Sequence, residues 1–395
     1  MPPPSKKRVF FAYFKPLTYS GQSAASELIL EELGKRGWDC HVIPVYPLER
    51  GVDNHVKSYA NFFAKQILTS LNFLRLLAEK KPILYLNLGQ SLSSFVRFGL
   101  PYFPVRMLKP GMRVVVSLHG SVFMGWKKSQ PLTRIFLFFL HGAEFVTVLG
   151  DRQKSFLTQL GVPHEKITVL PNTCEIDVCS STQIVDKHKM PEIINILHLS
   201  LLIESKGFPS FLEAIEKFTT VSLEKPINVI LCGPMAFTNY CSELDTAIKK
   251  ELWITEKIES INANGGGKVN VKWIRGAEGE KKEALFKNAH LFVFPSRYPV
   301  EAQPLVLLEA MASGVALITS DVGEITSTLH DVDAAVLTDI SSTVLATEMQ
   351  KLVHDDERRV KMALSGRRAM LTKFSVQNYA DRWEVIFSQL SGLEK

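Results

Sequence analysis

The chain has 395 residues, of which 46% are hydrophobic and 22% are charged, so its composition excludes an intrinsically disordered protein. At about 150 residues per domain, this length predicts two or three domains. Five cysteines form no CxxC pair. No apolar run approaches the roughly 20 residues of a membrane-spanning helix. We therefore expect a cytoplasmic protein with reduced thiols.

Charge is unevenly divided along the chain. Residues 1–195 carry 24 Lys and Arg against 14 Asp and Glu, whereas the remaining 200 residues carry 22 against 26. A basic N-terminal half favours an anionic partner, and the candidates are membrane lipid, a phosphorylated acceptor and nucleic acid. The alternative is an ordinary basic surface without a dedicated partner.

The first 172 residues alternate strands and helices, as in a doubly wound α/β domain. Strands are predicted over 9–13, 39–45, 82–88, 113–118, 145–149 and 167–171, and helices over 24–36, 59–80, 132–142 and 151–160. The apolar residues of 59–80 keep the spacing of an amphipathic helix: Phe62, Phe63, Ile67, Leu71, Leu74 and Leu77.

Residues 91–113 combine aromatic and basic side chains: Phe95, Arg97, Phe98, Tyr102, Phe103, Arg106, Lys109 and Arg113. Such a segment can lie on a membrane surface. It can equally be part of a core with a basic rim, because scattered surface aromatics are common. The sequence leaves both interpretations open.

Residues 173–193 are polar and lack periodicity, which predicts a linker between two domains. A second strand and helix alternation follows, so we expect domains over 1–172 and 194–373, with a last helix at 374–390. Strands are predicted over 194–199, 227–232, 269–274, 292–294, 315–318 and 334–337, and helices over 208–218, 280–288, 305–313 and 345–365. The segment 237–264 is polar and is also expected to form a helix.

The stretch 292–322, FVFPSRYPVEAQPLVLLEAMASGVALITSDV, carries the clearest chemical signal. Glu309 lies among apolar neighbours, where a carboxylate is costly to bury unless it accepts hydrogen bonds. Glu301 lies eight residues earlier, and the free amides of a helix starting near Pro304 could hold a phosphate between them. The alternative is that Glu301 is a favourable charge near a helix start and Glu309 pairs with a lysine.

These two glutamates and the surrounding text resemble the E-x7-E motif of the retaining GT-B glycosyltransferases of the family 4 type (glycosyl transferases group 1). The resemblance extends over nearly the whole chain and is strongest over 194–325. It implies an α/β fold of the GT-B class, with two doubly wound Rossmann-like domains facing across a cleft. It also implies that helix 374–390 packs back on the first domain.

The resemblance assigns roles to individual residues. Lys206 would hold the donor diphosphate, Glu301 the hydroxyls of the donor sugar and Glu309 those of the ribose. His119, after the strand 113–118, would line the donor-sugar side of the cleft, and with Lys206 and Glu301 it makes up the expected catalytic set. The expected donor-binding residues are Gly21, Gly233, Arg275, Gly276, Gln303, Pro304, Leu305 and Glu309.

One position departs from the family pattern. Leu201 stands where the family has an arginine that helps to hold the diphosphate. Arg297 is a candidate substitute. The departure keeps open a nucleotide-sugar-binding protein without turnover. A further alternative is a GT-B enzyme that is not a transferase, such as a phosphorylase or an epimerase.

The expected reaction is transfer of a hexose from a nucleotide-diphosphate-sugar to a lipid-linked, polysaccharide or protein glycan acceptor, with retention at the anomeric carbon. We expect no cofactor and no metal. No nucleic-acid partner is expected. Contact of the N-terminal half with an anionic membrane makes the inner face of the cell membrane a candidate location.

Overall fold

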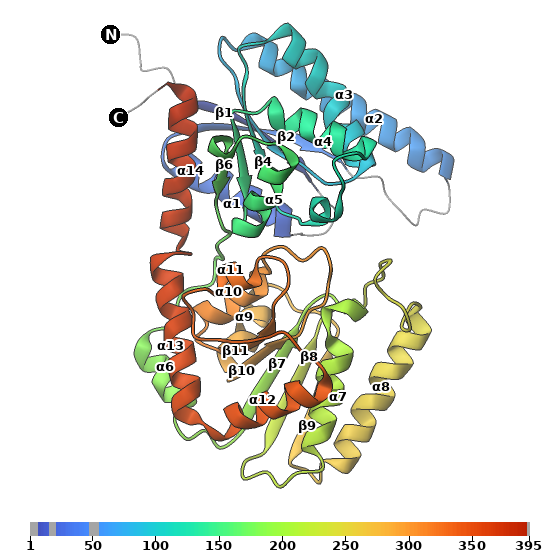
Figure 1. Cartoon of the computed structure of the whole chain (residues 1–395), viewed down its shortest axis with the longest axis vertical. Helices are drawn as coiled ribbons and strands as arrows, with labels where there is room; N and C mark the ends of the chain where they lie inside the picture. The colour runs from blue at the N-terminus through green and yellow to red at the C-terminus, as the bar shows by residue number, and fades with distance from the viewer. Residues whose placement is uncertain (1–6, 16–20, 47–54, 393–395) are drawn as a thin grey trace. The chain divides into compact units, whose positions relative to one another are not determined.

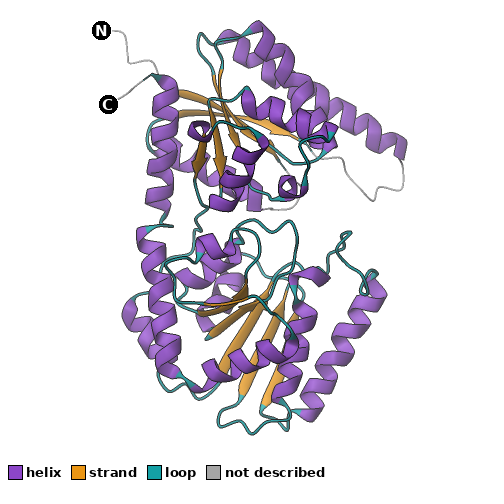
Figure 2. Ribbon diagram, viewed as in Figure 1, coloured by secondary structure: helices purple, strands orange, loops and turns teal. Residues whose placement is uncertain are grey.

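The computed structural model describes residues 7–15, 21–46 and 55–392. The chain divides into two compact units, one made of Met1–Asn172 together with Val376–Lys395 and the other of Thr173–Ser375. Each unit contains a six-stranded parallel sheet with helices packed against it (Figures 1 and 2). The α/β class and the two Rossmann-like halves predicted from the sequence are confirmed.

The sheet of the first unit has the strand order β2-β1-β3-β4-β5-β6. Its strands are β1 (Arg8–Phe14), β2 (Asp39–Val45), β3 (Ile83–Asn87), β4 (Arg113–Ser117), β5 (Phe145–Val148) and β6 (Ile167–Val169). Its helices are α1 (Gly21–Lys35), α2 (His55–Leu74), α3 (Leu92–Leu108), α4 (Pro131–His141), α5 (Asp151–Leu160) and α14 (Val376–Ser391). The order reverses between β1 and β3, and ligands of such sheets bind beyond the carboxyl ends of the strands at this point.

The sheet of the second unit has the strand order β12-β11-β10-β7-β8-β9. Its strands are β7 (Ile194–Leu199), β8 (Ile227–Cys232), β9 (Val269–Ile274), β10 (Leu291–Phe294), β11 (Ala316–Ser320) and β12 (Ala335–Leu337). Its helices are α6 (Ser181–His188), α7 (Phe208–Phe218), α8 (Ala247–Asn264), α9 (Gly279–Asn288), α10 (Leu305–Ala312), α11 (Ile325–Thr328), α12 (Ser342–His354) and α13 (Asp356–Thr372). Here the order reverses between β7 and β10.

The last helix, α14, completes the core of the first unit. Trp383 and Phe387 are buried against the sheet, with ring centroids 5.4 Å from Tyr85 and 5.8 Å from Phe11, respectively. Arg36 of the first unit donates to Asp381, with 2.6 Å between nitrogen and oxygen. Residues distant in sequence therefore share one hydrophobic core.

Three sequence predictions differ from the structure in detail. Residues 173–193 contain α6, whose start is stabilised by reciprocal hydrogen bonds between Ser180 and Gln183. The helix predicted over 345–365 is two helices, because the side chain of Asp355 accepts from the amide of Arg358 and caps α13. The helix predicted over 59–80 ends at Leu74 and continues as a 3₁₀ turn.

The exposed side of α2 is also unexpected, because Phe63, Ile67, Leu71 and Leu74 are all exposed to solvent while Phe73 is buried. An amphipathic helix normally turns its apolar stripe towards the core. In α3 the aromatic residues Phe95, Phe98 and Tyr102 are buried, as the core interpretation requires, but aliphatic residues point outward. Within the described ranges no helix has both the length and the apolar character needed to cross a bilayer.

Candidate active site

Lys206 and Glu301 meet at the strand reversal of the second unit. Lys206 ends the 3₁₀ turn η4 (Glu204–Lys206) that follows β7, and Glu301 lies in the loop after β10. The Lys206 ammonium lies 3.2 Å from Oε2 of Glu301, and both side chains are largely buried. The same ammonium lies 5.2 Å from the centre of the Tyr298 ring. Two residues 95 positions apart in sequence thus form a shielded ion pair at the edge where open α/β sheets bind ligands.

The backbone around Glu301 is tightly packed. Ser296 Oγ donates to Glu301 Oε2 over 3.1 Å. Gly323 has a φ of +57°, and a Cβ built on it would lie 2.2 Å from the carbonyl oxygen of Glu301. A side chain at position 323 would therefore displace the loop that carries Glu301.

Glu309 lies in the middle of α10 and is 7% exposed. Its Oε1 accepts from the Lys282 ammonium of α9 over 2.5 Å. Its Oε2 is buried and accepts no hydrogen bond from the residues that the structure describes. Burial raises the pKa of Glu309, and the charge of Lys282 opposes this shift. The predicted lysine pair therefore exists, but it uses only one of the two oxygens, so the carboxylate can still accept from a hydroxyl group.

The start of α10 agrees with the helix predicted from residue 305. Pro304 is the N-cap residue, and Leu305 is the first residue of the helix. The Gln303 side chain donates to Thr328 Oγ1 over 3.1 Å and is buried. The amide of Leu307 donates to the carbonyl of Pro304 over 3.1 Å. The two amides before it lie at the positive end of the helix dipole, where a helix offers no acceptor of its own.

Gly233, Arg275 and Gly276 follow the strands β8 and β9, on the same edge of the sheet as Lys206. A Cβ on Gly233 would lie 1.7 Å from the carbonyl oxygen of Ser200, so only glycine allows the two loops to pack there. The Arg275 side chain is 60% exposed and pairs with Glu251 of α8 over 2.5 Å.

Leu201 is 51% exposed and offers no cation to a diphosphate. The amide of Arg297 donates to the carbonyl of Ser205 over 2.6 Å, which holds this exposed residue against the turn of Lys206. An arginine is therefore available next to Lys206 from a different loop.

The remaining two predicted residues belong to the first unit. His119 lies two residues beyond β4 and is half-buried, with Nε2 3.0 Å from Ser117 Oγ. Burial lowers the pKa of His119 to about 4, against a hydrogen bond with Asn172 that raises it. The imidazole is therefore neutral near pH 7. Gly21 is the first residue of α1, and the loop before it lies outside the described residues.

Histidine burial predicts a pH dependence of stability. Besides His119, burial lowers the pKa of His198 and His290 to about 4 and that of His188 to about 3. In the unfolded chain histidine titrates near pH 6.5 and therefore binds protons first as the pH falls. Each buried histidine therefore leaves the folded state at its full stability above about pH 6.5 and makes it progressively less stable as the pH falls towards about 4.

We expect the chain to unfold at a lower urea concentration at about pH 5 than at about pH 7, with unfolding followed by tryptophan fluorescence. The unfolding free energy should fall by on the order of 1–2 kcal/mol for each of these histidines. Glu309 opposes this trend, because a carboxylate with a raised pKa gains stability on acidification. A midpoint that is equal at the two pH values, or higher at the lower one, would contradict the expectation.

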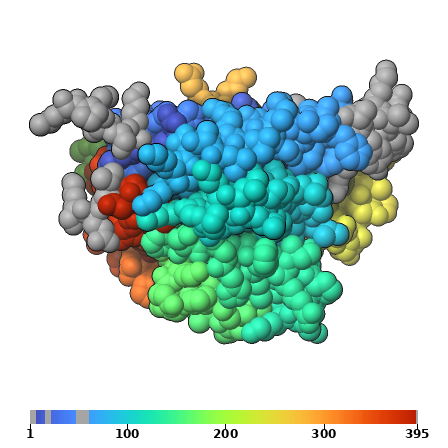
Figure 3. All heavy atoms as spheres, turned by 90° about the horizontal axis from the view of Figure 1, so that it is seen from above, coloured from blue at the N-terminus to red at the C-terminus, as the bar shows by residue number. Residues whose placement is uncertain are grey.

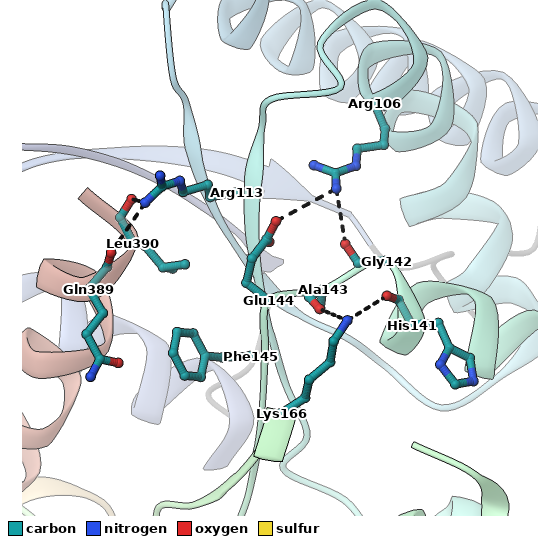
Figure 4. A pocket seen from close by; sticks show the side chains of 10 residues that line it. All are labelled: Arg106, Arg113, His141, Gly142, Ala143, Glu144, Phe145, Lys166, Gln389 and Leu390. Atoms are coloured by element: carbon teal, nitrogen blue, oxygen red, sulfur yellow. Dashed lines mark hydrogen bonds and ion pairs between the residues drawn. The ribbon is translucent and has the colours of Figure 1, made fainter. Parts of the chain in front are cut away.

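A pocket of about 570 Å³ lies in the first unit, away from these residues (Figure 4). It is lined at the amino ends of β4, β5 and β6, which is the opposite edge of the sheet from His119. Lys166 donates to the carbonyls of His141 and Ala143 over 3.0 and 2.9 Å. Arg113 donates to the carbonyls of Gln389 and Leu390. These cations cap the carboxyl ends of α4 and α14, so we interpret the pocket as structural.

An Asp-x-Asp triplet, Asp331-Val332-Asp333, lies between α11 and β12. Asp333 is engaged by Arg358 over 2.7 Å and by Lys361 over 3.6 Å, while the Asp331 side chain is 77% exposed beside His330. Among the described residues no three His, Cys, Asp or Glu side chains cluster as metal ligands.

Two side chains that hydrogen-bond to the glutamates, Lys282 and Ser296, were not predicted from the sequence. Lys282 stands 27 residues before Glu309, in a lysine-rich helix where no pattern marks it. Ser296 belongs to the turn PSRYP, and its spacing of five residues from Glu301 could have suggested the contact.

Comparison with known proteins relates this chain to glycosyltransferases. Residues 182–369 match the family model described as "Glycosyl transferases group 1". The N-acetyl-alpha-D-glucosaminyl L-malate synthase of Bacillus anthracis is 22% identical over 302 residues, which cover 74% of this chain and 73% of that protein. The alpha-maltose-1-phosphate synthase of Mycolicibacterium smegmatis is 29% identical over 147 residues, 35% of this chain and 38% of that protein.

Solved structures share the fold over almost the whole chain. The sucrose-phosphate synthase of Thermosynechococcus elongatus superposes with a TM-score of 0.68 at 15% identity, covering 98% of this chain and 100% of that one. Anabaena HepE in complex with UDP gives a TM-score of 0.67 at 14% identity, covering 97% of this chain and 100% of that one. These likenesses confirm the predicted GT-B fold.

Proposed function

We propose that this chain, a group 1 glycosyltransferase with the GT-B fold, transfers a hexose from a nucleotide-diphosphate-sugar with retention at the anomeric carbon, as family 4 enzymes do. The observation that carries the proposal is the carboxylate of Glu309. One of its oxygens is paired with Lys282, and the other is buried without a partner among the described residues. A buried acceptor of this kind suits the hydroxyl groups of a ribose.

Lys206 and Glu301 would divide the rest of the donor between them. Their ion pair lies at the strand reversal, and an incoming diphosphate would compete with Glu301 for the Lys206 ammonium. The first amides of α10 would take part of the phosphate charge. Both would stabilise the charge that develops on the leaving diphosphate as the sugar departs.

Glu301, released from Lys206, would then accept hydrogen bonds from the sugar hydroxyls. Neutral His119 would be able to donate or accept a hydrogen bond on the sugar. Positioning of this kind requires no strong base, and we propose that the diphosphate itself takes the proton of the acceptor hydroxyl. We propose that the reaction needs no metal ion.

The nucleotide and the acceptor extend the proposal. HepE has been solved with UDP and with UDP-glucose, so UDP is the first nucleotide to test. The acceptor class is a lipid-linked, polysaccharide or protein glycan. We place the enzyme in the cytoplasm, with its basic first unit in peripheral contact with the inner face of the cell membrane.

A panel of UDP, GDP, ADP and their sugars tests the donor site by thermal shift. Binding at a hundredfold excess over Kd stabilises a protein by about 2.7 kcal/mol, which a thermal shift detects. One nucleotide diphosphate should raise the melting temperature, and Glu309→Ala should remove the rise. No shift with any nucleotide would overturn the donor site.

A nucleotide-sugar-binding protein without turnover is the second candidate, favoured by Leu201 in place of an arginine. An active transferase consumes the bound nucleotide-sugar and releases the nucleoside diphosphate, whereas a binding protein does neither. Binding without release, in the presence of glycan and lipid-linked acceptors, would favour the second candidate.

A further inference from the structure

Two helices of the first unit turn apolar side chains outward. On α2 the exposed side chains are Phe63, Ile67, Leu71 and Leu74, which are 48–63% exposed, and on α3 they are Leu92, Val96, Leu100 and Met107, which are 46–83% exposed. Within each helix these residues recur at intervals of three, four or seven positions. Each set therefore forms a stripe along one face of its helix.

The inner side of α2 explains why its apolar stripe points outward. Thr69 Oγ1 donates to the carbonyl of Pro44 over 2.9 Å, and Gln66 Nε2 donates to the carbonyl of Arg97 over 3.1 Å. Phe73 fills the remaining space in the core. The helix is therefore anchored through polar contacts, and its larger apolar surface remains in solvent. Exposed apolar patches of this extent mark interaction sites.

The stripes lie on neighbouring helices. The bond between Gln66 and Arg97 joins α2 to α3. Phe103 of α3 and Phe138 of α4 are in edge contact with centroids 5.1 Å apart, and Phe138 is 66% exposed. Figure 3 shows α2 in blue beside α3 in cyan on this side of the first unit. We call the two stripes together with Phe138 the apolar face.

The charge around the apolar face identifies its partner. Residues 55–142 contain 12 Lys and Arg and a single acidic residue, Glu79, which is paired with Arg8. Four of the cations are not at the apolar face, because Arg97 is buried and because Arg106, Lys109 and Arg113 donate to main-chain carbonyls. Arg75 follows the α2 stripe directly, and Arg134 lies one helical turn before Phe138; both are exposed. Two copies of this chain meeting through the apolar face would bring their basic surfaces together, which is unfavourable. A bilayer with anionic headgroups matches both the apolar and the basic part.

We propose that the apolar face inserts its aliphatic side chains into the headgroup and acyl boundary of an anionic membrane, with Arg75 and Arg134 at the lipid phosphates. This rests on the proposed function and deepens it, because a lipid-linked acceptor would be met at that surface. The stripe on α3 runs from Leu92 to Met107, a distance of about 22 Å along the helix axis, so the contact is broad enough to orient the first unit.

The test is co-sedimentation of the full chain with phosphatidylcholine vesicles, with and without phosphatidylglycerol. We expect binding to the anionic vesicles only, and a loss of at least about tenfold in the double variant Leu71→Glu/Leu100→Glu. Both side chains are more than half exposed, so the fold should tolerate the changes. Ile248→Glu in α8 is the matched control, since Ile248 is 81% exposed in the second unit.

Three outcomes would overturn the proposal. The wild type does not sediment with anionic vesicles, the double variant sediments as the wild type does, or Ile248→Glu loses as much binding as the double variant. Analytical ultracentrifugation adds a further check, because a dimer that the double variant dissociates would assign the apolar face to self-association. The thermal shift with nucleotide does not depend on lipid. If vesicle binding is absent but the thermal shift is retained, the membrane proposal is wrong and the proposed donor site still stands.

Discussion

Replacing Glu309 with alanine should lower the rate of sugar transfer by on the order of 100-fold or more, as is typical when a preorganised polar contact is lost. The variant removes the buried acceptor and leaves the Lys282 ammonium without its carboxylate. Initial rates of nucleoside diphosphate release at saturating donor measure the effect. Activity within a few-fold of the wild type would sink the assignment of Glu309 to the donor site.

Two further variants separate a role in binding from one in folding. Glu283→Ala on the same helix as Lys282 removes an exposed ion pair with Lys287 and should change stability by less than about 0.5 kcal/mol and leave activity intact. Lys282→Met removes the charge that opposes the raised pKa of Glu309. Without this charge the Glu309 carboxylate takes up a proton at a higher pH. As the pH is lowered, the nucleotide affinity of the variant should therefore begin to fall at a higher pH than that of the wild type.

Replacing Lys206 with methionine should weaken the binding of nucleoside diphosphate by about 10- to 100-fold, the range for a lost hydrogen bond to a charged group. Methionine keeps the length of the side chain and its contact with the Tyr298 ring but has no charge. Titration calorimetry with the nucleotide identified by thermal shift measures the affinity. Lys351→Ala, which removes an exposed cation from α12, is the control and should bind normally.

The loss of Lys206 also leaves Glu301 buried without its cation, which lowers stability in its own right. The double variant Lys206→Met/Glu301→Gln should therefore regain melting temperature relative to Lys206→Met without regaining affinity. Recovery of both together would mean that the weak binding was a consequence of misfolding, and an unchanged affinity in Lys206→Met would exclude the lysine from the diphosphate site.

The strand, turn and helix that carry Glu301 and Glu309 were predicted from the sequence with nearly the observed bounds. The short apolar strand β10, the prolines of the turn and the glycine after α10 act locally, so the pattern suffices there. Lys282 could not be found in this way. Its pairing with Glu309 depends on how α9 packs beside α10, which is a tertiary property.

The orientation of α2 and the helical structure of α3 could not be predicted from the sequence. The spacing of apolar residues in α2 predicts a helix but not which side faces the core, and here Gln66, Thr69 and Phe73 face inward. In α3, Pro101 and Pro104 lie inside the helix, where proline usually ends one. The segment 91–113 therefore gave no clear helical pattern, although its buried aromatics form the core of the first unit.

The packing of α14 has a consequence for the order in which the chain acquires its structure. Synthesis runs from the N-terminus, and domains commonly fold in that order. Here Trp383 and Phe387 are core residues of the first unit, while all residues of the second unit precede them. The unit that begins first therefore cannot complete its core until α14 has emerged from the ribosome.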